Sequence, residues 1–175
     1  MAFQPPAGIS LETAPEGKTL NSMLLSGEID ALMAPHPPAA FLNGDARIAR
    51  LFPDPKAEEA RYARTRGYYP IMHLVTARDD VVARYPWVAR SMYDAFERAR
   101  QVTWEYYDDP NWSLLAWGRQ ALEEERALFG RDPWANGVKT NRANLEAFIG
   151  YSLEQGLISR RLSIEELFHP STLGS

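Results

Sequence analysis

The chain has no cysteine, which excludes several kinds of chemistry. Disulfide bonds, thiolate metal sites and cysteine nucleophiles all need that residue. Histidine is scarce as well: there are three, and no two have the helical spacing of a zinc-binding pair. The sequence also lacks a glycine-rich phosphate loop and the nucleophile elbow of serine hydrolases. We therefore expect neither a metal nor an organic cofactor.

Long apolar runs are missing too, and none approaches the ~20 residues that a membrane span needs. Residues 1–11 have neither the basic start nor the apolar stretch of a secretory signal. These absences predict a cytoplasmic location, or a periplasmic one if a missing amino-terminal segment carries a signal. Lysine and arginine are scattered and the formal net charge is −4, so we expect no nucleic-acid partner.

Three short stretches have the pattern of β-strands. Residues 9–13 alternate apolar and polar side chains, and residues 29–34 form a short apolar run. Residues 71–77 are mostly apolar around one embedded histidine. Two or three strands are too few for a stable doubly wound sheet. We therefore expect them to find neighbours in a homo-oligomer or in an amino-terminal segment missing from this chain.

Helical spacing dominates the remainder of the sequence. Helices are predicted over residues 19–27, 56–66, 86 onward, 109–129 and 141–155. Ser163 and Glu166 have the spacing of a capping box, which predicts a short helix after Ser163. The predicted fold class is therefore α/β, with a few strands followed by a mainly helical carboxy-terminal half.

One candidate site residue, His36, stands between prolines directly after the predicted strand 29–34. In open α/β sheets, ligands bind beyond the carboxyl ends of the strands. Because proline fixes φ, the flanking prolines restrict the positions that His36 can take. The alternative interpretation is a rigid turn that carries a solvated histidine.

A second group of candidate residues lies along residues 66–73: Arg66, Tyr68, Tyr69, Met72 and His73. Guanidinium, phenol and imidazole together suit a polar aromatic acid. Arginine clamps carboxylates, tyrosine stacks and hydrogen-bonds, and histidine exchanges protons near neutral pH. The alternative is that His73 is a hydrogen-bonded core residue of the predicted strand 71–77.

An ordered series of short motifs resembles the 4,5-dihydroxyphthalate decarboxylase family and its substrate-binding relatives. The series includes LSGEIDAL at residues 25–32, APHPP at 34–38, RLFPD at 50–54, YPIMH at 69–73, YPWVA at 85–89, DPW at 132–134, NR at 141–142, EQGL at 154–157 and EELF at 165–168. Together the motifs extend from about residue 9 to residue 172. In many members of that family we would expect arginine where this chain has His36.

The resemblance implies an incomplete fold of the type 2 periplasmic-binding-protein class. Residues 1–17 would end the second lobe and form the hinge, and residues 18–175 would form the carboxy-terminal part of the two-lobed fold. An amino-terminal stretch of similar size would supply the other strands, and the ligand would lie between the lobes.

The resemblance implies non-oxidative decarboxylation of a hydroxylated aromatic carboxylic acid similar to 4,5-dihydroxyphthalate. Our residue assignments are physical ones. His73 donates the proton, and His36 and Arg66 anchor the substrate. Tyr69 contacts the ring or hydrogen-bonds to its hydroxyl, and Tyr68 and Met72 are further substrate-binding residues. One alternative is a solute-binding protein that delivers a small aromatic carboxylate to an ABC-type transporter. Another is a truncated product that is inactive alone.

Overall fold

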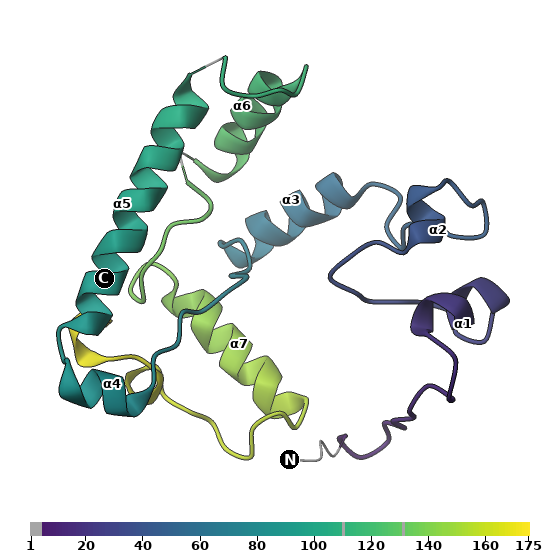
Figure 1. Cartoon of the computed structure of the whole chain (residues 1–175), viewed down its shortest axis with the longest axis horizontal. Helices are drawn as coiled ribbons and strands as arrows, with labels where there is room; N and C mark the ends of the chain where they lie inside the picture. Colours follow the sequence, from purple (N-terminus) through teal and green to yellow (C-terminus); the bar gives the residue numbers. More distant parts are fainter. Residues whose placement is uncertain (1–4, 110, 131) are drawn as a thin grey trace. The chain divides into compact units, whose positions relative to one another are not determined.

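The computed structural model describes residues 5–109, 111–130 and 132–175. Two compact units can be separated, one formed mainly by residues 60–175 and the other by residues 5–59. Throughout these described ranges the regular structure is helical (Figure 1). The helices are α1 Leu20–Ser26, α2 Ala39–Leu42, α3 Pro55–Arg66, α4 Asp79–Arg84, α5 Val88–Asp108, α6 Gly118–Phe129, α7 Arg142–Glu154, α8 Ile164–Leu167 and the 3-10 helix η1 Pro170–Thr172.

The predicted α/β fold of the periplasmic-binding-protein class is therefore wrong for this structure. No β-strand occurs among the described residues, and the stretches 9–13, 29–34 and 71–77 have no regular secondary structure. A strand is stable only when a neighbour completes its ladder of hydrogen bonds. None of the three stretches has such a neighbour here, so their apolar pattern does not become a sheet.

Several helices follow the sequence prediction closely. Helix α1 ends at Gly27, whose φ of 76° is the left-handed conformation that glycine adopts most readily. Helix α7 runs between Asn141 and Gln155, within a residue of the predicted bounds at each end. The capping box is also confirmed: the Ser163 side chain accepts a hydrogen bond from the Glu166 amide, and Glu166 reaches back to the Ser163 amide.

Two predicted helices begin later than expected. Helix α5 starts at Val88, two residues beyond Pro86. Helix α6 starts only at Gly118, and Pro110 lies outside the described residues. In the segment that precedes α6, the side chains of Asp109 and Ser113 accept hydrogen bonds from backbone amides two residues further on. Such local bonds compete with helical ones and favour turns.

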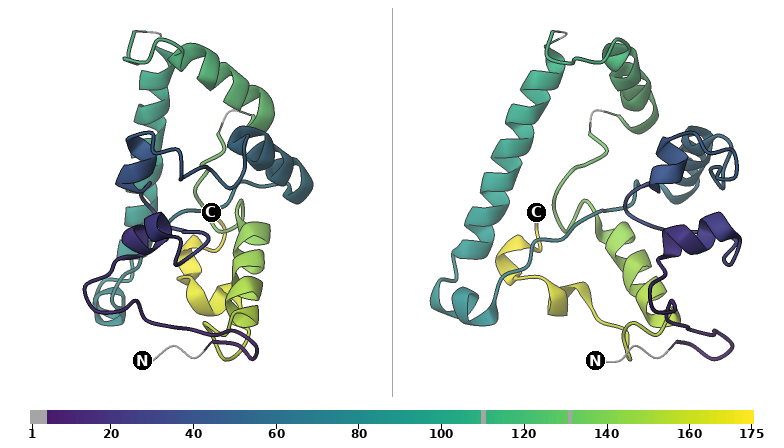
Figure 2. Two further views of the ribbon diagram at one scale, coloured as in Figure 1. Left: turned by 90° about the vertical axis from the view of Figure 1, so that its right-hand side faces the viewer. Right: turned by 45° about the vertical axis from the view of Figure 1, so that its right-hand side comes forward.

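The buried core of the unit 60–175 is small and centres on α7. Val138, Leu145, Ile149 and Ile164 form it, and four partly buried side chains pack around them: Ile71, Ile158, Phe168 and Leu173. Helix α7 packs against α8, and α5 packs against η1. Figure 2 shows the latter contact, where the yellow end of the chain lies beside the start of α5. The core therefore joins the carboxy-terminal segments to the stretch that contains Ile71.

The unit 5–59 has no comparable core. None of its described residues is buried, and large apolar side chains such as Met33 and Leu51 are 100% and 81% exposed. Helices α1 and α2 are short and contain no buried residue. Short helices of this kind are marginal in water without an apolar face to pack against. The apolar side chains of this unit are consequently available to another surface.

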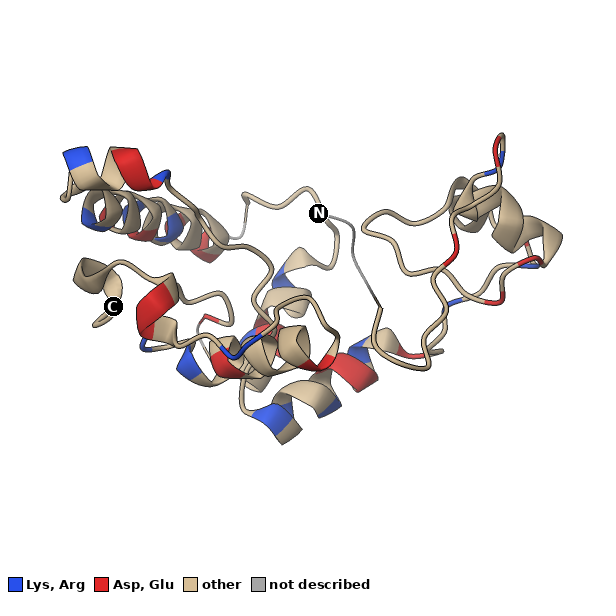
Figure 3. Ribbon diagram, turned by 90° about the horizontal axis from the view of Figure 1, so that it is seen from below, with Lys and Arg blue, Asp and Glu red and all other residues tan. Residues whose placement is uncertain are grey.

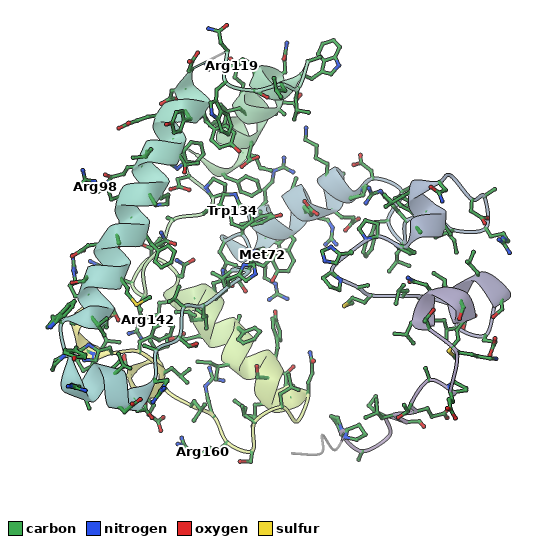
Figure 4. The ribbon with its side chains drawn as sticks, in the orientation of Figure 1. Met72, Arg98, Arg119, Trp134, Arg142 and Arg160 are labelled. Atoms are coloured by element: carbon green, nitrogen blue, oxygen red, sulfur yellow. The ribbon has the colours of Figure 1, made fainter. Side chains whose placement is uncertain are left out.

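Charged residues of both signs are interspersed along the helices, as their scattering in the sequence predicts (Figure 3). Near α8, Arg160 and Arg142, both labelled in Figure 4, form ion pairs with Glu166 and Glu165 at 2.7 and 2.8 Å. Among the described residues, no helix combines the length and the apolar character that crossing a bilayer requires.

The capping box predicts a pH-dependent contribution to stability. The hydrogen bond from Arg160, followed by those from Ser163, lowers the pKa of Glu166 to about 2. The carboxylate is therefore favoured in the folded state. Its contribution is present above the unfolded pKa of about 4.3 and is lost as the pH falls toward 2. We expect Glu166→Gln to lower the melting temperature at pH 7 and to have a smaller effect at pH 3. Thermal unfolding monitored by circular dichroism measures this difference, with Glu16→Gln in an exposed turn as the control.

Candidate functional site

The stretch 68–73, which contains most of the predicted site residues, is fixed to α7 at two points. The side-chain amide of Asn144 donates a hydrogen bond of 2.8 Å to the carbonyl oxygen of Tyr69. Asn144 is only 5% exposed, so this bond is shielded from water. Two residues later, Ile71 packs against the core cluster. The backbone between Tyr69 and Ile71 is thus held by one polar and one apolar contact.

Tyr62, Tyr68, Tyr151 and Arg66 form what we call the tyrosine cluster. The ring of Tyr68 stands edge-on to that of Tyr62, with 6.1 Å between their centroids. The guanidinium carbon of Arg66 lies 5.9 Å from the centre of the Tyr62 ring. A hydrogen bond with Tyr68 and then burial raise the pKa of Tyr62, while a hydrogen bond with Tyr151 acts in the opposite direction. Three phenols and one cation are thereby gathered between α3 and α7.

This cluster is chemically complementary to a ring that carries a carboxylate and a hydroxyl group. Arg66 is exposed, and no ion pair joins it to a carboxylate within residues 5–109, 111–130 and 132–175. Its guanidinium can therefore bind an external carboxylate through two parallel hydrogen bonds. Phenol groups can donate hydrogen bonds to ring hydroxyls and accept them in return. A carboxylate and a hydroxyl on one small ring would both find complementary groups here.

The structure brings some of the predicted residues together and separates others. Arg66 and Tyr68 meet in the tyrosine cluster, and Tyr69 is half-buried beside them in the sequence. Met72 and His73 follow the fixed backbone at Tyr69 and Ile71, and both side chains are exposed. The interpretation of His73 as a core residue is therefore wrong. His36 is exposed and belongs to the other unit, residues 5–59.

Sequence reasoning missed Tyr62, Tyr151 and Asn144. Tyr62 precedes Arg66 by four residues, so the two share one face of α3, and this spacing could have revealed the pair. Asn144 is a polar residue in a helix otherwise rich in apolar side chains, which hints at a buried hydrogen bond. Tyr151 gave no comparable signal, because only the packing of α7 brings it to Tyr62.

Tyr69 also connects this region to a second one. Its ring meets Trp134 and Phe129 edge-on, with centroids 4.9 and 5.3 Å away. Trp134 in turn lines a pocket of about 500 Å³ beside α5 and α6, with Trp104, Tyr107 and Trp112. Figure 4 labels Trp134 and Met72, one from each of the segments that Tyr69 connects.

The pocket beside α5 and α6 is poorly suited to a dianionic acid. Arg100 lines it, but Glu97 and Asp132 both form ion pairs with this guanidinium. The other basic lining residue, Arg119, pairs with Glu123 at 2.8 Å. Asp109 and Glu125 add two more carboxyl groups to the lining. Since like charges repel, this surplus of carboxyl groups disfavours a carboxylate ligand in the pocket, whereas the tyrosine cluster offers an arginine without a carboxylate partner among the described residues.

Clusters of metal-binding side chains are absent from the part of the chain that the structure describes. No group of three or more histidine, aspartate or glutamate side chains is placed there to hold an ion.

Two proteins of one name are similar to this chain in sequence. No family model matches the chain. The 4,5-dihydroxyphthalate decarboxylase of Comamonas testosteroni is 34% identical over 172 residues, which are 97% of this chain and 52% of that protein. The 4,5-dihydroxyphthalate decarboxylase of Pseudomonas putida is 38% identical over 63 residues, or 36% of this chain and 24% of that protein.

The chain thus spans about half the length of the Comamonas testosteroni protein, and a smaller share of the other. It stays a prediction that this chain corresponds to the carboxy-terminal part of the fold and that it divides at residue 17. The resemblance in the motifs is confirmed: along 97% of its length, this chain is a sequence relative of the 4,5-dihydroxyphthalate decarboxylases.

Proposed function

We propose that this chain supplies part of the active site of a non-oxidative decarboxylase for a hydroxylated aromatic carboxylic acid. The observation that carries the proposal is the identity with a protein of that name along nearly the whole chain. The tyrosine cluster supports it independently, because an available guanidinium and three phenols match a carboxylate and ring hydroxyls. 4,5-Dihydroxyphthalate is the substrate that the names of both relatives suggest.

In the proposed reaction a proton replaces the carboxylate on the aromatic ring. Arg66 binds one carboxylate of the substrate, and tyrosine phenols hydrogen-bond to the ring hydroxyls. The imidazolium of His73 gives its proton to the ring carbon that bears the departing carboxylate. The bond to that carboxylate then breaks, its electrons restore the aromatic ring, and CO2 leaves. Water finally gives a proton to the imidazole and restores the imidazolium, and the hydroxide that is left combines with the released CO2 as bicarbonate. Atoms and charge therefore balance without an electron-accepting cofactor.

The hydroxyl groups of the substrate and the removal of water by the site together make this route chemically reasonable. Ring hydroxyls donate electron density, which stabilises the protonated ring before CO2 departs. The site must also remove water from the departing carboxylate while the other carboxylate stays anchored. Half-buried Tyr68 and Tyr69 would exclude water on one side of the ring, and exposed Met72 would contact it from the neighbouring backbone position. An anchoring role for His36 stays a prediction.

Both relatives are named as enzymes, so the alternative of a solute receptor gains no support from them. The test is CO2 release from 4,5-dihydroxyphthalate. We expect release from a chimera in which this chain replaces the matching 172 residues of the Comamonas testosteroni decarboxylase. Tight binding of the substrate by a folded chimera without any CO2 release would contradict the enzymatic proposal and favour the receptor.

A further inference from the structure

The surface area of this chain is far larger than its mass predicts. A folded monomer of 19.8 kDa should expose about 8,600 Å². The chain exposes 13904 Å², an excess of about 5,000 Å². Only six apolar residues are buried in the described part, whereas many large apolar side chains are exposed. Exposed apolar side chains in this number are typical of a surface that another polypeptide covers.

Association of the two units with each other would not remove this excess. Interfaces between domains of one chain bury about 600–1,500 Å². An ordinary dimer is also insufficient, because a standard interface buries about 800 Å² on each partner. The excess is several times larger and involves both units, from Met33 and Leu51 to Leu114 and Trp117, which are 102% and 75% exposed. A partner that covers this excess must therefore contact the chain along much of its length.

We propose that this surface is covered by a polypeptide equivalent to the part of the Comamonas testosteroni decarboxylase that this chain does not match. That part makes up nearly half of the relative, so its size is similar to that of this chain. Two halves of one fold share an extensive apolar interface, which resembles a domain core cut in two. The unit 5–59, which has no buried residue, acquires its core only from this complement.

The exposed area and the extent of the sequence match support this complement, and neither depends on the proposed decarboxylase activity. The two therefore fail separately. A complex that forms but releases no CO2 would contradict the proposed activity and leave the proposed complement standing. CO2 release by the chain alone, as a compact monomer, would contradict the proposed complement and support the activity.

The experiment mixes this chain with the unmatched part of the Comamonas testosteroni decarboxylase, expressed as a separate polypeptide. Size-exclusion chromatography with light scattering should give a 1:1 complex. Amide hydrogen exchange should show residues 5–59 unprotected in the chain alone and protected in the complex. The double variant Met33→Glu with Leu51→Glu should weaken the complex at least tenfold, because it places two charges in the apolar contact. Gln101→Glu, on the exposed surface of α5, is the matched control.

Three results would overturn the proposal. The first is a monomer of the isolated chain with a radius of gyration near the roughly 16 Å of a compact domain of this length and protected amides throughout. The second is a homodimer that protects residues 5–59, because the occupant is then a second copy. The third is the absence of a complex with the Comamonas testosteroni polypeptide while amide exchange leaves residues 5–59 unprotected.

Discussion

Replacement of His73 by glutamine is expected to lower the rate of CO2 release by roughly 10²–10⁴-fold, the usual contribution of a positioned general acid. Glutamine keeps a similar length and can hydrogen-bond, but it has no proton to give to a ring carbon. Because His73 is exposed and follows the fixed backbone at Ile71, the substitution should leave folding unchanged. The loss should therefore appear in kcat, with the affinity for substrate almost preserved.

The measurement uses the chimera with the Comamonas testosteroni decarboxylase and follows CO2 release at saturating 4,5-dihydroxyphthalate. His169→Gln is the matched control, since the His169 ring lies 2.8 Å from the Ser171 hydroxyl at the start of η1 and is far in sequence from the tyrosine cluster. Arg66→Gln should instead raise KM, because it removes a carboxylate anchor. A His73→Gln rate within about threefold of the unmodified chimera would disprove the donor role, given the contribution expected of a general acid.

Asn144→Leu is expected to destabilise the unit 60–175 by about 1–3 kcal/mol, the cost of leaving a buried polar group without its partner. Leucine has a similar volume but cannot donate to the Tyr69 carbonyl, which lies 2.8 Å from the Asn144 amide nitrogen. Loss of this bond should also release the backbone that carries Tyr68 and His73. We therefore expect weaker substrate binding together with the lower stability.

Asn144→Asp separates the hydrogen bond from side-chain size. At pH 7 its carboxylate would face the Tyr69 carbonyl with two acceptors opposed, so this variant should be less stable than Asn144→Leu. Burial raises the pKa of a carboxyl group, and the protonated acid can donate to the carbonyl. Its stability relative to Asn144→Leu should consequently recover as the pH falls toward 4. Chemical denaturation at the two pH values measures this.

Asn111→Leu, at an exposed loop position, is the control for these two variants and should change stability by less than about 0.5 kcal/mol. Equal stability of Asn144→Asp and Asn144→Leu at both pH values would show that the hydrogen bond to Tyr69 does not hold the segment.

Most features that depend on near neighbours in the sequence were predicted correctly, and features that depend on distant residues were not. The end of α1 at Gly27, the bounds of α7 and the capping box at Ser163 were all predicted, because each depends on neighbours within a few residues. The late start of α6 was not predicted, because hydrogen bonds to Asp109 and Ser113 stabilise turns where the apolar spacing suggested a helix.

The predicted strands are wrong because a strand depends on a partner that is distant in the sequence. Apolar alternation at residues 9–13 and 71–77 records a preference for an extended chain but cannot supply the neighbouring strand. In residues 71–77 the only side chain that reaches the core cluster is Ile71, and the bond between Asn144 and Tyr69 holds the adjoining backbone. That tertiary contact links residues 75 positions apart.

The sequence by itself determined the similarity to 4,5-dihydroxyphthalate decarboxylases and the principal helices, and it pointed to Arg66 and Tyr68, since motifs and helical spacing depend on residues that are near one another in the chain. Only the tertiary structure decided that Tyr62 and Tyr151 join Tyr68, that His73 is exposed, and that residues 5–59 lack a core. The physical reason is that side-chain burial and contacts between distant residues depend on how helices pack, and local propensity does not specify packing.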